Sequence, residues 1–321
     1  MKKSTVYDWI RRFREGRTSL EDNEREGRPK TAVTEVNSEK VRQLILNDRR
    51  VTVREIQSET GLCVASIHHI IHEELHMRKL TARWVPRLLT EDHKMKRLSI
   101  SKELLSRVEE EGDCFWKRMI TMDETWLPHY NPETKSQSRQ WCGAGDMPPV
   151  KARTVASAEK IMMSVFWDTE GVLLVDFLEK GATINSEYYC SLLKKLRETI
   201  RFKRRGKLSS VPILHHDNAT PHTAKITGET VEKFGWEILP HPPYSPDLAP
   251  SDFFLFGALK KPLRGRKFQN RETLIQEVSE WLKNQPKSFF ETGITTLAKR
   301  WHKCVRAGGG YIEKFVEDEE Q

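Results

Sequence analysis

The sequence predicts an α/β domain with a mixed sheet flanked by helices, preceded by an all-helical region. Short apolar runs rich in β-branched residues, which are typical of buried strands, lie beyond residue 113. Amphipathic helical patterns alternate with these runs from residue 185 onward. Within the first 112 residues, apolar side chains recur at helical spacing in short units separated by polar segments.

The helical region begins with an amphipathic pattern over residues 5–13, in which an apolar stripe lies opposite Arg11 and Arg12. A second unit is more complete. A capping box begins at Thr52, Gly61 provides a turn, and isoleucines continue the apolar stripe on the next helix. Helix, short turn and helix is the order of a helix-turn-helix, although an ordinary helical hairpin has the same pattern.

If the second unit is a helix-turn-helix, its second helix presents polar side chains to a DNA major groove. These side chains are Ser66, His68, His69 and His72. Between the two units, the segment EGRPK supplies Arg28 and Lys30 on a backbone slim enough for an A·T minor groove. A plain linker is the alternative for this segment.

Two features precede the α/β domain. A proline among large apolar residues at 84–89 indicates a docking segment, on this chain or on a partner chain, and an amphipathic basic helix is expected over 91–110. We therefore expect four regions. They are 1–33, a partial helix-turn-helix with the GRPK linker; 34–80, a second helix-turn-helix; 81–112, a linker with a docking helix; and 113–321, the α/β domain with an insertion at about 127–160.

The α/β domain is expected to open with three strands joined as hairpins and to continue with alternating helices and strands. We expect strands at 116–126, 161–167, 172–178, 211–214 and 236–239, and helices at 185–202, 221–234, 271–285 and 289–306. This element order is that of an RNase H-like domain. The polar, proline-containing stretch after residue 126 is too irregular for the core, so we expect a loop that projects over the active face.

Three aspartates lie where the expected elements end or begin. Asp123 is near the end of the first strand, Asp217 follows the strand at 211–214, and a proline-rich turn delivers Asp252 to the start of an apolar helix. Carboxylate oxygens suit Mg²⁺, and two ions about 3.5–4 Å apart would activate a water and stabilise a leaving 3′ oxygen. Alone, each aspartate has a simpler role, as a strand end or a helix N-cap. Three in matching contexts favour the metal site.

Several residues near these aspartates have two possible roles. Asn218 and His222 are placed to orient Asp217 or a phosphate, while a purely structural hydrogen bond fits His222 equally well. Glu124 is either a fourth acid or a solvated residue. The basic run at 201–207 suits DNA backbone, a nuclear address or an ordinary solvated loop.

Composition limits the class of protein. The 321 residues carry a formal charge of +8, which favours a polyanionic partner, although a solvated basic face gives the same charge. The five cysteines are widely spaced, without a C-x-x-C pair, and so argue for a reducing compartment rather than disulfides or a zinc site. No apolar run approaches about 18 residues, so we expect a soluble intracellular protein without a membrane partner.

Three motifs together resemble the mariner family of Tc1/mariner transposases. They are TMDETW at 121–126, HDNATPHTA at 216–224 and YSPDLAPSD at 244–252, and 34 residues separate Asp217 from Asp252, as in that family. The WVP at 84–86 and the GRP at 27–29 fall where the family has its linker motifs. The resemblance extends over nearly the whole chain.

The resemblance implies a homodimeric, nuclear DNA transposase that acts on double-stranded DNA and on no small-molecule substrate. Asp123, Asp217 and Asp252 would be the catalytic triad, holding two Mg²⁺ ions per site with Mn²⁺ as a substitute. Residues 1–80 would bind terminal inverted repeats, the triad would cleave at the element's ends and join them to target DNA at TA, and the 127–160 insertion would be a clamp loop between subunits.

The resemblance has one departure. The family's first helix-turn-helix has helices before the 5–13 pattern, and here three residues stand in their place. We therefore expect weaker binding to inverted repeats and impaired assembly, which a gel-shift titration with and without restored residues would test. The alternatives to an active transposase are an inverted-repeat binding protein without catalysis and a metal-dependent nickase.

Overall fold

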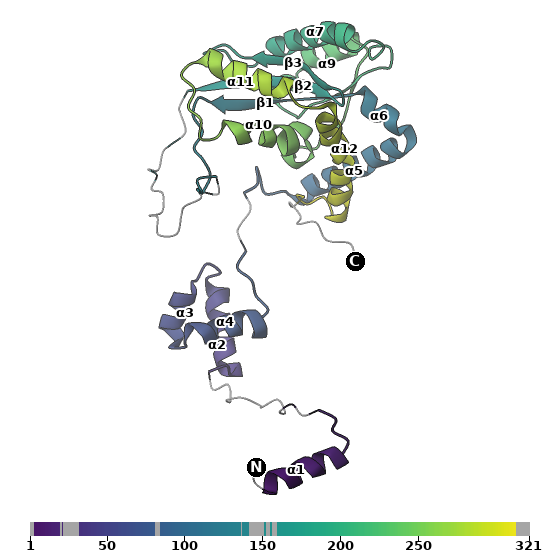
Figure 1. Ribbon diagram of the computed structural model, residues 1–321. Helices are drawn as coiled ribbons and strands as arrows, with labels where there is room; N and C mark the ends of the chain where they lie inside the picture. The colour runs from purple at the N-terminus through teal and green to yellow at the C-terminus, as the bar shows by residue number, and fades with distance from the viewer. Residues whose placement is uncertain are drawn as a thin grey trace. The chain divides into compact units, whose positions relative to one another are not determined.

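The structure is a computed structural model that describes residues 3–19, 21, 32–80, 84–135, 137–140, 151, 155 and 159–312 (Figure 1). The chain divides into two compact units, a helical unit, Met1–Trp84, and an α/β unit, Val85–Gln321. In these ranges, no helix combines the length and the apolar character needed to cross a membrane.

The helical unit contains α1 (Lys3–Arg14) and a small bundle of α2 (Glu35–Asn47), α3 (Val53–Thr60), α4 (Val64–His69) and the π-helical turn η1 (Ile70–Glu74). The bundle has its own core, built on the fully buried Val41, Ile56, Ile67 and Ile70. The expected capping box is present, because Thr52 and Glu55 exchange hydrogen bonds at the start of α3.

A left-handed glycine ends α3 and sets the turn to α4. Gly61 has φ of 71°, a conformation that costs a residue with a β-carbon about 1–2 kcal/mol. The predicted order of helix, glycine turn and helix is therefore observed.

The α/β unit is built on a five-stranded mixed sheet. Its strands are β1 (Met119–Pro128), β2 (Lys160–Asp168), β3 (Gly171–Phe177), β4 (Ile213–His215) and β5 (Glu237–Ile238), in the order β3-β2-β1-β4-β5. The central strand, β1, is antiparallel to β2 and parallel to β4, with Asp123 opposite Val165 and Thr121 opposite His215. This is the mixed sheet that the sequence predicts.

Helices cover both faces of this sheet (Figure 1). Side chains of β1 alternate between the faces: Ile120 and Met122 join one core with α7 (Ser186–Lys203) and α9 (Lys225–Lys233). Met119 and Leu127 join the other core, to which α5 (Glu91–Glu111), α10 (Phe256–Leu263), α11 (Arg271–Lys283) and α12 (Lys287–Arg306) contribute.

Two predicted elements need correction. The expected strand at 116–126 begins only at Met119, because residues 113–118 form the helix α6 (Asp113–Arg118), in which the adjacent rings of Phe115 and Trp116 are both buried. Alternation along a strand would have sent one of them to the opposite face.

The helix expected at 221–234 is broken into α8 (Thr220–Thr223) and α9. Ala224 is extended between them, and the Thr227 hydroxyl donates to the carbonyl of Pro221 at 2.7 Å, which satisfies one group at the break. The break places α8 where it can make its tertiary contacts.

The border between the units lies near residue 84 rather than at the acidic segment near 112. Helix α5 packs along α12 and contributes Leu104 and Leu105 to the core of the α/β unit, so it belongs to that unit. In the expected docking segment, Trp84 and Leu88 are 98% and 85% exposed. Half of the expected insertion at 127–160, and Arg28 and Lys30, lie outside the described residues.

Candidate active site

The three predicted aspartates come from three different elements of the α/β unit. Asp123 lies within β1, paired with β2, and is half-buried. Asp217 follows the end of β4, the parallel neighbour of β1, by two residues. Asp252 lies in η3 (Ser251–Leu255), a π-helical turn that leads into α10 and contacts β1. The sheet and one flanking helix thus bring together residues that are far apart in the sequence.

Asp217 is held by two hydrogen bonds to one of its oxygens. Oδ1 accepts from the backbone N–H of Ala219 at 2.9 Å and from Nδ1 of His222 at 2.6 Å. Burial opposes ionisation of Asp217, but these hydrogen bonds lower its pKa to about 2. Since both bonds use Oδ1, the second oxygen remains available as a ligand.

His222 bridges two acids. Its other ring nitrogen, Nε2, donates to Glu124 Oε1 at 3.3 Å, so the imidazole lies between Glu124 and Asp217. Burial lowers the pKa of His222, but the hydrogen bonds to Asp217 and Glu124 outweigh it and raise the pKa to about 9. The break before α9 allows this placement, because His222 lies in the short helix α8.

The structural hydrogen bond that the sequence left open is therefore present, and the orientation of Asp217 by His222 stays a prediction. Glu124 is a partner of this histidine rather than a solvated residue, since its side chain is only 16% exposed.

The neighbouring histidines are neutral. Burial and the positive charge of His222 lower the pKa of His216 to about 3, and the two rings stack with their centroids 5.0 Å apart. Burial also lowers the pKa of His241 to about 4 and holds that of His215 well below its usual value. His222 is thus the charged member of this cluster.

Asp123 and Asp252 interact directly. Burial raises the pKa of Asp123 well above its ordinary value, and the charge of Asp252 raises it further. Asp252 is exposed as a residue, but partial loss of hydration raises the pKa of its carboxyl group to about 6, with a hydrogen bond to Asp123 acting in the opposite direction. Burial is thus the main cause of both shifts, and repulsion between the two carboxylates adds to that of Asp123.

The chemistry of this donor set fits divalent cations. Asp217 repels both other carboxylates, so the three carboxyl groups lie within electrostatic reach of one another. A cation would relieve that repulsion. Over the described ranges, no group of three or more His, Cys, Asp or Glu side chains is arranged so that it could hold a metal ion, so the fit is one of chemistry and not of the present arrangement.

Lys260 is a neighbour of the site that the sequence analysis did not single out. Loss of hydration lowers its pKa, and the charges of Asp252 and Asp123 act against that change. Lys260 lies in α10, two turns of helix beyond Asp252. Helical spacing counted from residue 252 would therefore have predicted its place near the site.

The other predicted site residues lie apart from the carboxylates. Asn218 donates to the carbonyl of His241 at 2.8 Å and so joins the loops that follow β4 and β5. In the basic run at 201–207, Arg204 and Lys207 are ion-paired with Asp168, which is fully buried. Part of that run is therefore structural.

In the helical unit, the predicted DNA-contact residues differ in their exposure to solvent. His68 and His72 are exposed, with stacked rings 5.8 Å apart, whereas Ser66 and His69 are half-buried. On α1, Arg11 is exposed and Arg12 lies 5.4 Å from the centroid of the Trp9 ring. DNA contact by these residues stays a prediction.

Comparison with known proteins identifies the family. Residues 131–210 match the family described as Transposase (partial DDE domain). The chain is 31% identical to the Mariner Mos1 transposase of Drosophila mauritiana over 307 residues, which cover 95% of this chain and 86% of that protein. The chain belongs to the mariner transposases.

A solved Mos1 structure and one further relative support this membership in the mariner family. The crystal structure of the Mos1 mariner paired end complex with Mn has a TM-score of 0.79 at 30% identity, covering 98% of this chain and 89% of that one. This similarity confirms the predicted RNase H-like fold. Human histone-lysine N-methyltransferase SETMAR is 34% identical over 313 residues, 96% of this chain but only 44% of that protein. The chain therefore spans less than half of that relative.

Proposed function

We propose that this mariner transposase binds the inverted repeats of its own element, cleaves DNA phosphodiesters and joins the freed 3′ ends to target DNA at TA. The observation that carries the proposal is the electrostatic interaction among Asp123, Asp217 and Asp252, which lie in β1, after β4 and in η3. The similar Mos1 structures include a paired-end complex with a left transposon end and a strand transfer complex. We extend that chemistry to this chain.

The cofactor in this proposal is Mg²⁺ or Mn²⁺, two ions per site, with both metals named for the similar Mos1 complexes. When bound, the ions would supply Lewis-acid activation of the attacking water or hydroxyl and stabilise the leaving oxygen. The chain's own residues have distinct tasks. Asp123, Asp217 and Asp252 hold the cations, and His222 fixes the orientation of Asp217 through its Oδ1 atom.

DNA binding and assembly complete the proposal. We place the inverted-repeat contacts in the helical unit, on His68 of α4, His72 of η1 and Arg11 of α1, all of which are exposed. We further propose a homodimer acting in the nucleus, since two transposon ends must be brought together before joining.

The test is a supercoiled donor plasmid that carries the inverted repeats, incubated with the full chain and Mg²⁺ or Mn²⁺. We expect excised element and joined product, both lost in Asp217→Asn. Nicked plasmid alone would favour a metal-dependent nickase. A gel shift on the same repeats without any cleavage would favour a DNA-binding protein and contradict the proposed catalysis.

A further inference from the structure

The third aspartate differs from the other two in what fixes its position. Asp123 is held by pairing of β1 on the sheet, and Asp217 follows a sheet strand by two residues. Asp252 has no strand to hold it, because η3 lies outside the sheet. Its position therefore depends on the turn that precedes it, at residues 243–251, as well as on the hydrogen bond from Trp167 of β2 to Ser251.

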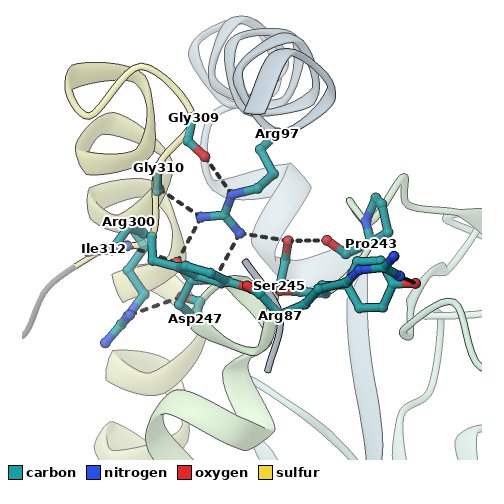
Figure 2. Close-up of polar contacts among 11 residues, drawn as sticks. Arg87, Arg97, Pro243, Ser245, Asp247, Arg300, Gly309, Gly310 and Ile312 are labelled. Atoms are coloured by element: carbon teal, nitrogen blue, oxygen red, sulfur yellow. Dashed lines mark hydrogen bonds and ion pairs between the residues drawn. The ribbon is translucent and has the colours of Figure 1, made fainter. Parts of the chain in front are cut away.

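That turn is held by a buried arginine from a distant helix. Arg97 of α5 is fully buried, and its guanidinium makes five hydrogen bonds (Figure 2). Nη1 donates to Ser245 Oγ at 2.6 Å and to Asp247 Oδ1 at 2.9 Å, and Nη2 donates to Asp247 Oδ2 at 2.8 Å. The remaining two bonds, from Nε and Nη2, reach the carbonyls of Gly309 and Gly310 at 2.8 and 3.0 Å. The five bonds match the five N–H donors of a guanidinium.

Asp247 joins the same turn to the end of the chain's last helix. Its Oδ2 accepts from the backbone N–H of Ile312 at 3.0 Å, and its own carbonyl accepts from Arg300 of α12 at 2.9 Å (Figure 2). Ser245 Oγ donates in turn to the carbonyl of Pro243 at 2.9 Å. One ion pair thus connects α5, the turn and the segment after α12.

A glycine makes this connection sterically possible. A β-carbon at Gly309 would lie 2.1 Å from the carbonyl oxygen of Lys94, and its φ of 84° is in the left-handed region. The close approach of this glycine turn to α5 brings the two glycine carbonyls to Arg97.

The path from Asp247 to Asp252 is short and rigid. Leu248 N–H donates to the carbonyl of Ser245 at 2.9 Å, which closes the 3-10 turn η2 (Pro246–Leu248). Phe253 N–H donates to the carbonyl of Ala249 at 3.1 Å, and Trp167 Nε1 of β2 donates to Ser251 Oγ at 3.0 Å. These bonds connect the turn at Asp247 to η3, while the bond from Trp167 ties Ser251 to β2.

We propose that Arg97 is a positioning residue that holds the Ser245–Asp247 turn so that the Asp252 carboxylate meets Asp123. A buried ion pair contributes little to stability compared with apolar packing of similar volume, so its directed bonds are the feature that packing would not replace. This inference rests on the proposed function, because it assumes that Asp252 binds a metal ion.

The test measures Mn²⁺ binding by the full chain without DNA. Binding is monitored through the decrease of the free Mn²⁺ signal in electron paramagnetic resonance. The part of the Mn²⁺ binding that is lost in the Asp252→Asn variant is the binding at the proposed metal site. Arg97→Lys keeps the charge but cannot make the five-bond fork, and we expect it to weaken that binding by about tenfold or more. The Arg97→Met/Asp247→Leu double variant removes the buried charges together and keeps the test valid if Arg97→Lys does not fold. We expect the same weakening there.

Asp168→Asn is the matched control, since it breaks another fully buried ion pair, with Arg204 and Lys207, in the same unit. We expect it to lower the melting temperature while Mn²⁺ affinity stays native. Native affinity in both Arg97 variants would overturn the inference and leave the proposed function intact. If the Mn²⁺ affinity of the Asp168→Asn control also fell in proportion to its loss of stability, the inference would be overturned as well, because the role of Arg97 would then be merely structural. Absence of any Asp252-dependent binding in the native chain would overturn the proposed function together with the inference.

Discussion

Replacing His222 with glutamine should remove a pH-dependent contribution to stability. The imidazolium of His222 is 1% exposed and lies 2.6 Å from Asp217 and 3.3 Å from Glu124. Glutamine keeps one hydrogen-bond donor but has no charge. The carboxylates of Asp217 and Glu124 then lose the cation between them, and the free energy of unfolding should fall.

The magnitude follows from the pKa of His222, which is raised from 6.5 to about 9. That increase corresponds to about 3 kcal/mol. Because the Asp217 side chain is 46% exposed, water screens part of the interaction, and we expect about 2 kcal/mol. A raised histidine pKa stabilises the folded state fully below pH 6.5, and the contribution is lost as the pH rises through 9.

The assay is denaturant unfolding of the metal-free full chain, followed by tryptophan emission at a series of pH values between 6.5 and 9. The native chain should lose about 2 kcal/mol more than His222→Gln across this range. His241→Gln is the control: burial already lowers the pKa of His241 to about 4, so its loss should leave the slope native. If the free energy of unfolding varied with pH in parallel for the native chain and His222→Gln, the positive charge assigned to His222 would be refuted.

Three other predictions concern separate parts of the chain. Asp252→Asn removes a carboxylate that repels its neighbours, so DNA cleavage should be lost while the melting temperature stays native or rises; a clear fall would contradict the repulsion. Thr52→Ala removes the cap of α3 and should cost the helical unit about 1 kcal/mol, measured by amide hydrogen exchange, with the α/β unit unchanged. Gly293→Ala places a β-carbon 2.6 Å from the Phe254 ring and 3.0 Å from Trp167, so thermal unfolding should show about 1–3 kcal/mol of destabilisation; a native melting temperature would show that both rings move freely.

Local patterns were sufficient for most of the fold. The capping box at Thr52, the asparagine that begins α7 and the strand pairs around the 168–171 turn are each determined by neighbours along the chain, and each is observed. The predictions that were wrong are those in which distant residues decide. Trp116 is helical because its ring stacks on Trp301 with centroids 6.0 Å apart, and no signal near residue 116 records that partner.

The candidate site divides in the same way. Sequence spacing and motif were enough to select Asp123, Asp217 and Asp252, whose chemistry is carried by residue type. Spacing gave no indication that Glu124 shares His222 with Asp217, because the contact spans β1 and α8.

By itself, the sequence predicted the family of this protein, the order of its strands along the chain and three candidate metal-binding aspartates, since these depend on side-chain type and local periodicity. Only the tertiary structure decided which groups are charged and what holds them in place. Burial and the distance to a partner set the charge of His222 and the bonding of Arg97 to Asp247. The charge of His222 depends on Asp217, 5 residues away, and on Glu124, 98 residues away, while Arg97 and Asp247 are 150 residues apart, and only packing of the folded chain brings the distant partners together.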